Sequence, residues 1–270
     1  MTTQTRPDPP ALAVRVPAIT ALFWIVKILT TGGGETSSDY LGHTFPPALV
    51  AGAGVLILAG ALVLQFRMRR YYAWTYWLAV SMVAIFGTMF ADVAHAIGHN
   101  YLWSTLGFSV LLVVLFALWY RSEGTLSIHS ITTRRREAFY WATVIVTFAL
   151  GTAAGDMTAT TFGWGYLTSG LIFLAAIVVV AAAHFVSHAS LPAGHRHRAT
   201  SGVVAFWLAY VLTRPLGASF ADWMSMPPER GGLGWGDGLV SVVLFVVIIA
   251  FVAYLAATKV DVQREGADGL

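Results

Sequence analysis

Long apolar runs, separated by short polar or basic links, divide almost the whole chain into segments of membrane-spanning length. A helix that crosses a hydrocarbon core of ~30 Å needs about 20 largely apolar residues. Transmembrane strands would be shorter and would alternate polar with apolar residues, so the runs are interpreted as helices. The pattern predicts eight transmembrane helices, at residues 16–40, 47–66, 71–95, 101–120, 138–158, 165–186, 202–224 and 237–257.

A motif with fixed spacing recurs four times within this pattern. An aromatic residue precedes a tryptophan, a glycine follows ten residues after the tryptophan, and an aspartate follows fifteen residues after it. The motif residues are Trp24, Trp77, Trp141 and Trp207, then Gly34, Gly87, Gly151 and Gly217, then Asp39, Asp92, Asp156 and Asp222. Each motif lies in an odd-numbered helix, so the sequence predicts an all-α polytopic membrane protein built from four tandem parallel helical-hairpin repeats.

The repeats define a single transmembrane domain at residues 16–257. Its four hairpins are predicted at residues 16–66, 71–120, 138–186 and 202–257. In each hairpin the odd helix carries the motif. The even helix carries few polar residues and is expected to support the odd one. Residues 1–15 and 258–270 are predicted to be short tails.

Composition excludes a water-soluble protein, because the chain is 57% hydrophobic and only 11% charged, with a mean hydropathy of +0.70. Soluble domains carry about 25% charged residues. The absence of cysteine excludes disulfides, a thiolate nucleophile and Cys-ligated metals.

The basic residues predict the orientation. Of the 16 lysines and arginines, 13 lie in the tails and in the links between hairpins. The positive-inside rule then places both termini and these links in the cytoplasm. Because orientation explains the basic residues, the partners expected are the lipid bilayer and a small ion or molecule, and no nucleic acid. The oligomeric state is left open.

The repeat resembles a bacterial membrane-protein family made of four tandem two-helix units, each marked by a tryptophan and catalogued as a repeat of unknown function. The stretches that carry the resemblance include Trp24-Ile-Val-Lys-Ile-Leu-Thr-Thr-Gly and Thr213-Arg-Pro-Leu-Gly-Ala-Ser-Phe-Ala-Asp. It covers nearly the whole chain, except the first fifteen and the last dozen residues. The resemblance implies this architecture and a location in the bacterial inner membrane, and it implies no activity.

The four aspartates are the leading candidates for function. At 1.5 Å per residue, each lies about 22 Å beyond its tryptophan. If the tryptophans mark the cytoplasmic interface belt, all four aspartates lie in the outer third of the membrane. A carboxylate there is costly unless it is paired, solvated or protonated. The aspartates therefore predict a cation or proton site between the odd helices; the alternative is that each anchors its helix at the outer interface.

The first repeat has further polar residues. Lys27, Thr31, Glu35 and Asp39 recur every four residues along one helix face. Three consecutive glycines, 32–34, interrupt this stripe. They indicate either an unwound binding segment, as in transporters, or an outer loop with Lys27 reaching towards the cytoplasm.

Arg214 and Pro215 distinguish the fourth repeat. Arg214 occupies the position held by Thr31, Ala84 and Phe148 in the other repeats. Two functional roles are open: an ion pair with an acid of the first repeat, or contact with an anionic substrate. The plainer alternative is neutralisation of one buried carboxylate.

Two histidine pairs are weaker candidates. Asp92, His95 and His99 form a candidate site for a divalent metal or a proton relay, and the alternative is a set of interfacial polar residues at a helix end. His184 and His188 are spaced for one helix face and raise an axial haem role.

These observations favour a transporter with a carboxylate-lined pathway between the odd-numbered helices. It moves a cation, of which a divalent metal ion is one candidate, or couples proton movement to a substrate. No catalytic residue and no certain cofactor are identified. A cation channel is the close alternative, although Lys27 and Arg214 break the ring of like groups that a pore requires. A haem-binding membrane redox protein and a non-transporting scaffold are further alternatives.

Overall fold

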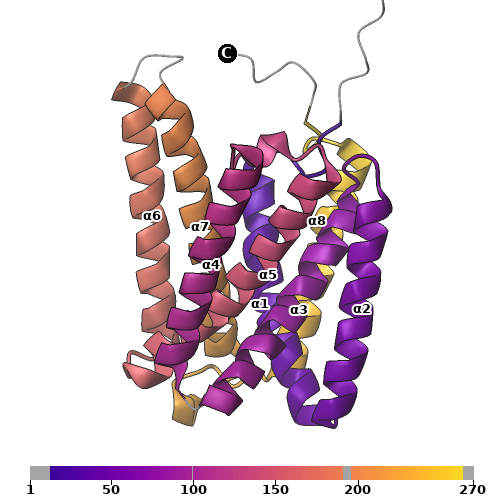
Figure 1. Ribbon diagram of the computed structural model, residues 1–270. Helices are drawn as coiled ribbons and strands as arrows, with labels where there is room; N and C mark the ends of the chain where they lie inside the picture. Colours follow the sequence, from indigo (N-terminus) through magenta and orange to yellow (C-terminus); the bar gives the residue numbers. More distant parts are fainter. Residues whose placement is uncertain (1–12, 99, 191–195, 264–270) are drawn as a thin grey trace, which may run out of the picture.

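The computed structural model describes residues 13–98, 100–190 and 196–263, and these residues form eight long helices and no strand (Figure 1). Three short turns lie between them: 3-10 turns at Ile128–Ser130 and Pro228–Arg230, and a π-helical turn at Met157–Thr161. The long helices are α1 (Ala21–Thr44), α2 (Pro47–Arg67), α3 (Ala73–Gly98), α4 (Tyr101–Glu123), α5 (Arg134–Asp156), α6 (Tyr166–Ser190), α7 (Arg196–Ser225) and α8 (Asp237–Thr258).

Seven of these helices, α2 to α8, are long and apolar enough to cross a membrane. The exception is α1, which carries the charged residues Lys27, Glu35 and Asp39. The described part of the chain is therefore all-helical, with the helix content of a multi-pass membrane protein.

The four odd helices form a closed ring. Each packs against the next in the order α1, α3, α5 and α7, and α7 packs back against α1. The even helices lie outside this ring and bury little of their surface. In the apolar windows of α3, α5 and α7, 50–61% of residues are buried, against 11–22% in the even helices. The interior of the protein is therefore the space between the odd helices.

Each even helix packs mainly against the odd helix that follows it, not against the one that precedes it. The main outer pairs are α2 with α3, α4 with α5, α6 with α7, and α8 with α1. The predicted hairpins are thus present as consecutive helices, but the two helices of one repeat are not principal packing partners. The contact of α8 with α1 joins the last repeat to the first and closes the assembly.

The repeated glycines lie where neighbouring ring helices come closest. A Cβ on each glycine would collide with the residue three positions before the glycine of the next repeat. The contacts are Gly34 with Ala84, Gly87 with Phe148, Gly151 with Arg214, and Gly217 with Thr31. Because the fourth contact returns to the first repeat, the same contact runs around the whole ring. Glycine at these positions allows the helices to approach more closely than any larger residue would.

A layer of aromatic side chains fills one end of the ring. In each repeat the aromatic residue before the tryptophan contacts the tryptophan of a neighbouring repeat, with ring centroids 5.6–6.3 Å apart. The pairs are Phe23–Trp77, Tyr76–Trp141, Tyr140–Trp207 and Phe206–Trp24. Trp77, Trp141 and Trp207 are buried. The expected interface belt is therefore wrong for these three, because they pack between helices instead of against lipid.

Residues just before α1 and just after α8 contact the ring helices, or residues next to them, at the same end as the aromatic layer. Arg15 pairs with the buried Glu137 (Nη1–Oε2 2.5 Å), and Gln65 donates a hydrogen bond to the other carboxylate oxygen at 3.1 Å. Near the end of α8, Asp261 accepts a hydrogen bond from the Tyr71 hydroxyl. Burial raises the pKa of the Asp261 carboxyl above its ordinary value. These contacts close this end of the ring, which we call the basic end.

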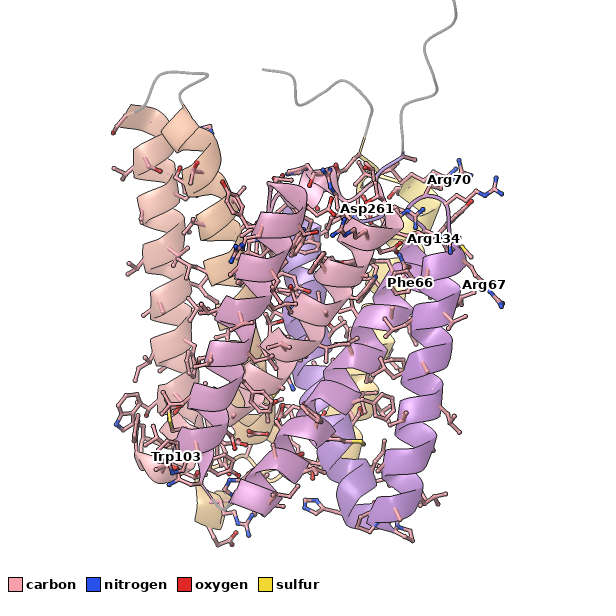
Figure 2. The ribbon with its side chains drawn as sticks, viewed as in Figure 1. Phe66, Arg67, Arg70, Trp103, Arg134 and Asp261 are labelled. Carbon is pink, nitrogen blue, oxygen red and sulfur yellow. The ribbon has the colours of Figure 1, made fainter. Side chains whose placement is uncertain are left out.

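Figure 2 shows the basic end at the top and the opposite end at the bottom. Its labelled residues at the basic end are Phe66, Arg67, Arg70, Arg134 and Asp261. Trp103 marks the opposite end, where the aspartates of the ring helices lie, and which we call the acidic end.

The glycine contacts predict an unusual order of mutational effects. Gly151→Leu should lower the melting temperature in detergent more than Leu150→Ala. The leucine side chain would collide with Arg214 on the neighbouring helix α7, whereas the alanine would leave only a cavity. Gly107→Leu is the matched control, since a Cβ at this helical glycine meets no atom within 4 Å. A larger loss for Leu150→Ala or for Gly107→Leu would show that the glycine spacing does not reflect packing.

Candidate functional site

Arg214 connects all four ring helices at the axis of the bundle. From α7 its Nη2 lies 2.7 Å from Glu35 Oε2 on α1 and donates to the hydroxyls of Thr88 on α3 and Thr152 on α5, the latter at 2.8 Å. Its Nη1 donates to the backbone carbonyl of Thr31 at 2.7 Å. Arg214 is 1% exposed and Glu35 is 3% exposed. The ion pair is therefore shielded from solvent, where breaking it leaves an uncompensated charge.

The Glu35 carboxylate is held through one oxygen. Besides Arg214, the hydroxyls of Thr88 and Thr152 approach Oε2, at 3.2 and 3.3 Å. None of these three contacts uses Oε1. Glu35, Thr88 and Thr152 each directly follow the repeated glycine. The close approach at the glycines therefore brings equivalent positions of three helices together at the axis.

Lys27 lies deeper in the ring, on the side of the aromatic layer. Its Nζ is 4.4 Å from the ring centroid of Phe148 and 4.3 Å from that of Tyr210. Arg214 lies 4.9 Å from the same Phe148 ring, so this ring contacts two cations, an arrangement that stabilises them through cation–π attraction. Lys27 is 1% exposed, and its Nζ has no hydrogen-bond partner among the described residues. The expectation that Lys27 reaches the cytoplasmic interface is therefore wrong.

The three consecutive glycines of α1 neither unwind the helix nor form a loop. The helix is continuous over Ala21–Thr44, so both interpretations of this segment are wrong. Gly32 faces α7, Gly33 faces Phe245 of α8, and Gly34 faces Ala84 of α3. A Cβ at Gly34 would collide with Ala84, whereas at Gly32 and Gly33 it would meet its nearest atoms at 3.2 and 3.3 Å, so α1 packs tightly against three neighbours at this level.

The four aspartates lie just beyond the ion pair, towards the acidic end. Asp222 is buried, Asp39 and Asp156 are half-buried, and Asp92 is exposed. Carboxylate oxygens of Glu35, Asp39 and Asp222 lie within 4.8 Å of one another. Asp92 and Asp156 are close enough to Glu35 for their charges to interact. This end of the ring thus carries five carboxylates, and among the described residues the buried cations are Lys27 and Arg214. Binding of cations or protons would offset the excess negative charge.

A hollow of about 520 Å³ lies at the same end. It is lined by Ser225, one turn beyond Asp222, and by His43, whose Nδ1 is 3.6 Å from Asp237. The hollow is partly open to the surroundings, whereas the aromatic layer and the chain ends close the basic end. The hollow therefore lies on the acidic side of the aspartates, one helical turn from Asp222.

Of the candidate histidines, the structure describes His95, His184 and His188. The His95 ring stacks on Tyr101, with centroids 3.6 Å apart and an interplanar angle of 7°. The site of Asp92, His95 and His99 stays a prediction, because His99 lies outside the described residues. His184 and His188 are on α6, outside the ring and near its basic end, so they do not face His95.

Sequence reasoning identified Lys27, Thr31, Glu35 and Arg214, but it missed Thr88 and Thr152. Both threonines follow the repeated glycine, as Glu35 does. Alignment of the repeats on their glycines would have found them, since polar residues occupy three of the four positions.

A protein-family model described as Repeat of Unknown Function (DUF347) matches four segments of the chain, at residues 22–71, 75–125, 139–190 and 205–261. The match confirms the resemblance of the four repeats to a family of this kind. Comparisons with curated proteins and with solved structures each gave no match.

The ion pair predicts strong coupling between Glu35 and Arg214. Glu35→Gln alone, or Arg214→Met alone, should lower the free energy of unfolding by roughly 3–5 kcal/mol, because each leaves a buried charge without its partner. The double variant should lose much less than the sum of the two, since it removes both charges. Unfolding in detergent, followed by tryptophan fluorescence, measures this cycle, and additive losses would contradict a direct interaction.

Proposed function

The chain belongs to the Repeat of Unknown Function (DUF347) family, and we propose that it is a membrane transporter that moves a cation, or couples proton movement to a substrate, through the carboxylate site at the axis of its ring. The observation that carries the proposal is the meeting of three carboxylates, from α1 and α7, beside one buried arginine at the axis of the ring. Ionisable groups inside a membrane are costly, and they characteristically line ion and proton pathways.

The proposal includes α1 as an eighth membrane span. Its low hydropathy comes from Lys27, Glu35 and Asp39, and two of these three side chains are buried at the axis. Since α3, α7 and α8 pack around α1, the helix needs little contact with lipid. Eight spans then place both chain ends on one side of the membrane.

The basic end is proposed to face the cytoplasm of a bacterium, with the protein in the inner membrane. The links that carry most of the arginines lie at this end, as the positive-inside rule requires. The hollow and the half-buried aspartates then face outwards. In this orientation the site receives its ion or proton from outside the cell.

Two features favour a transporter over a cation channel. Arg214 crosses the axis, and the aromatic layer fills the ring beyond Lys27. The positions equivalent to Arg214 hold Thr31, Ala84 and Phe148, which is not the ring of like groups that lines a selective pore. An ion bound from the acidic end therefore needs a conformational change to continue.

Removal of single carboxylates tests the transport proposal. Asp92→Asn and Asp156→Asn should each lower flux at least tenfold, because asparagine keeps the shape and hydrogen-bonding capacity of the side chain but not its charge. Flux is measured in liposomes with internal dyes for protons and for cations, under gradients of H⁺, Na⁺, K⁺, Ca²⁺ and Mn²⁺.

Glu229→Gln is the matched control, because this exposed carboxylate lies at the acidic end outside the cluster. Size-exclusion profiles and melting temperatures establish that the variants fold. Wild-type flux in both asparagine variants would make the aspartates structural. Flux of the wild-type protein no greater than that of empty liposomes would contradict transport.

The proposed orientation is tested by labelling single cysteines in this cysteine-free chain. His129 and Glu229 are exposed at opposite ends of the bundle. In intact spheroplasts an impermeant maleimide should label Glu229→Cys, and it should label His129→Cys only after lysis. The reverse pattern would invert the topology.

A further inference from the structure

Three of the acidic groups are spaced to hold one ion. The ligand oxygens of Glu35 and Asp39 on α1 and of Asp222 on α7 lie within 4.8 Å of one another. Oxygens that bind one Ca²⁺ at 2.3–2.6 Å are at most about 5 Å apart, and those around smaller divalent ions are closer. The three side chains therefore need no large movement to share a cation.

Glu35 is already oriented for this role. Arg214, Thr88 and Thr152 all contact its Oε2, and these contacts fix the carboxylate without using Oε1. In metal sites the ligands are commonly held in this way by surrounding hydrogen bonds. The contacts at the axis thus hold the Glu35 carboxylate in one orientation, with Oε1 not used by them.

Asp222 adds a second, independent observation at the three acids, an unpartnered carboxylate oxygen. Its side chain is buried, at 4% exposed, and its Oδ1 has no hydrogen-bond partner in the described parts of the chain. A buried carboxylate oxygen without a partner is strongly unfavourable. Ser225, one turn further along α7, also has a buried hydroxyl without a partner, and it lines the hollow at the acidic end. Two buried side-chain oxygens one turn apart on α7 are therefore without partners in the described parts of the chain, and Ser225, which carries one of them, lines the hollow.

The charges at this point match a divalent ion. Glu35, Asp39 and Asp222 carry three negative charges when ionised, and Arg214 compensates one of them. The other buried cation, Lys27, lies over the rings of Phe148 and Tyr210, about two helical turns before Glu35. Within this set of three carboxylates and one guanidinium, two negative charges remain, and one divalent cation neutralises both.

We propose that Glu35, Asp39 and Asp222 bind one divalent cation of the class that prefers oxygen ligands, such as Mn²⁺, Ca²⁺ or Mg²⁺. The ligand set contains only carboxylates, whereas zinc and copper sites usually include histidine or cysteine. This inference rests on the proposed transport function and names the substrate class of the same site.

Binding of Mn²⁺ to the purified full-length protein tests the inference. The protein is stripped with a chelator in detergent and titrated with Mn²⁺, and the electron paramagnetic resonance signal of free Mn²⁺ reports how much is bound. Wild-type protein should bind one Mn²⁺ per chain. Asp39→Asn and Asp222→Asn should each weaken binding at least tenfold, and the control Glu229→Gln should bind within twofold of wild type.

Asp39→Asn keeps the test decisive even where Asp222→Asn fails to fold, because Asp39 is only half-buried. Absence of saturable Mn²⁺ binding to the wild-type protein, or wild-type affinity in Asp39→Asn, would overturn the metal site. If proton or monovalent-cation flux is then still lost in Asp156→Asn, the transport pathway stands without a divalent ion. Specific Mn²⁺ binding without flux would instead support the site and contradict transport.

Discussion

The buried ion pair between Arg214 and Glu35 is the interaction on which the ring depends. The aliphatic part of Arg214 packs over Gly151 of α5, and its guanidinium contacts α1, α3 and α5 at once. In this arrangement the charge has partners on all three of the other ring helices. Since an unpaired buried charge costs several kcal/mol, the contact favours the closed ring over looser packing of the same apolar helices. Apolar packing alone would discriminate poorly, because lipid chains are as apolar as the helices.

The repeats build a symmetric scaffold, and function is proposed to depend on a few positions that depart from the symmetry. The glycine contacts and the aromatic layer recur in every repeat. The position after the glycine holds Glu35, Thr88, Thr152 and Ala218. Two of these residues, Thr88 and Thr152, donate to one carboxylate oxygen of a third, Glu35. Regular packing therefore brings the four positions together, and the differences among them create one asymmetric site in place of four weak ones.

The sequence predicted the helices and the repeat, but not which helices are neighbours. Hydropathy locates a segment such as α2, yet it cannot show that α2 packs on α3 and not on α1, because it describes the composition of one segment and not its neighbours. The same limit explains the tryptophans: Trp77 was expected at the lipid interface, and it is buried between ring helices. When the first helix was considered alone, Lys27 was expected to reach towards the cytoplasm, and the glycines before Glu35 were expected to form a loop or an unwound segment. Packing against α3, α7 and α8 for the glycines, and against Phe148 and Tyr210 for Lys27, places them inside a regular helix.

Glu35 joins the stability of the ring to the chemistry proposed for it. One oxygen of its carboxylate holds Arg214, and the carboxylate also faces Asp39 and Asp222. A cation bound by these acids would draw electron density from Glu35 and weaken its attraction for Arg214. Binding would then loosen the contact that connects α7 to the other three ring helices. A ligand shifts a conformational equilibrium only through its different affinity for the two states. Competition between a bound cation and Arg214 for one carboxylate supplies such a difference, in the place where the four helices meet.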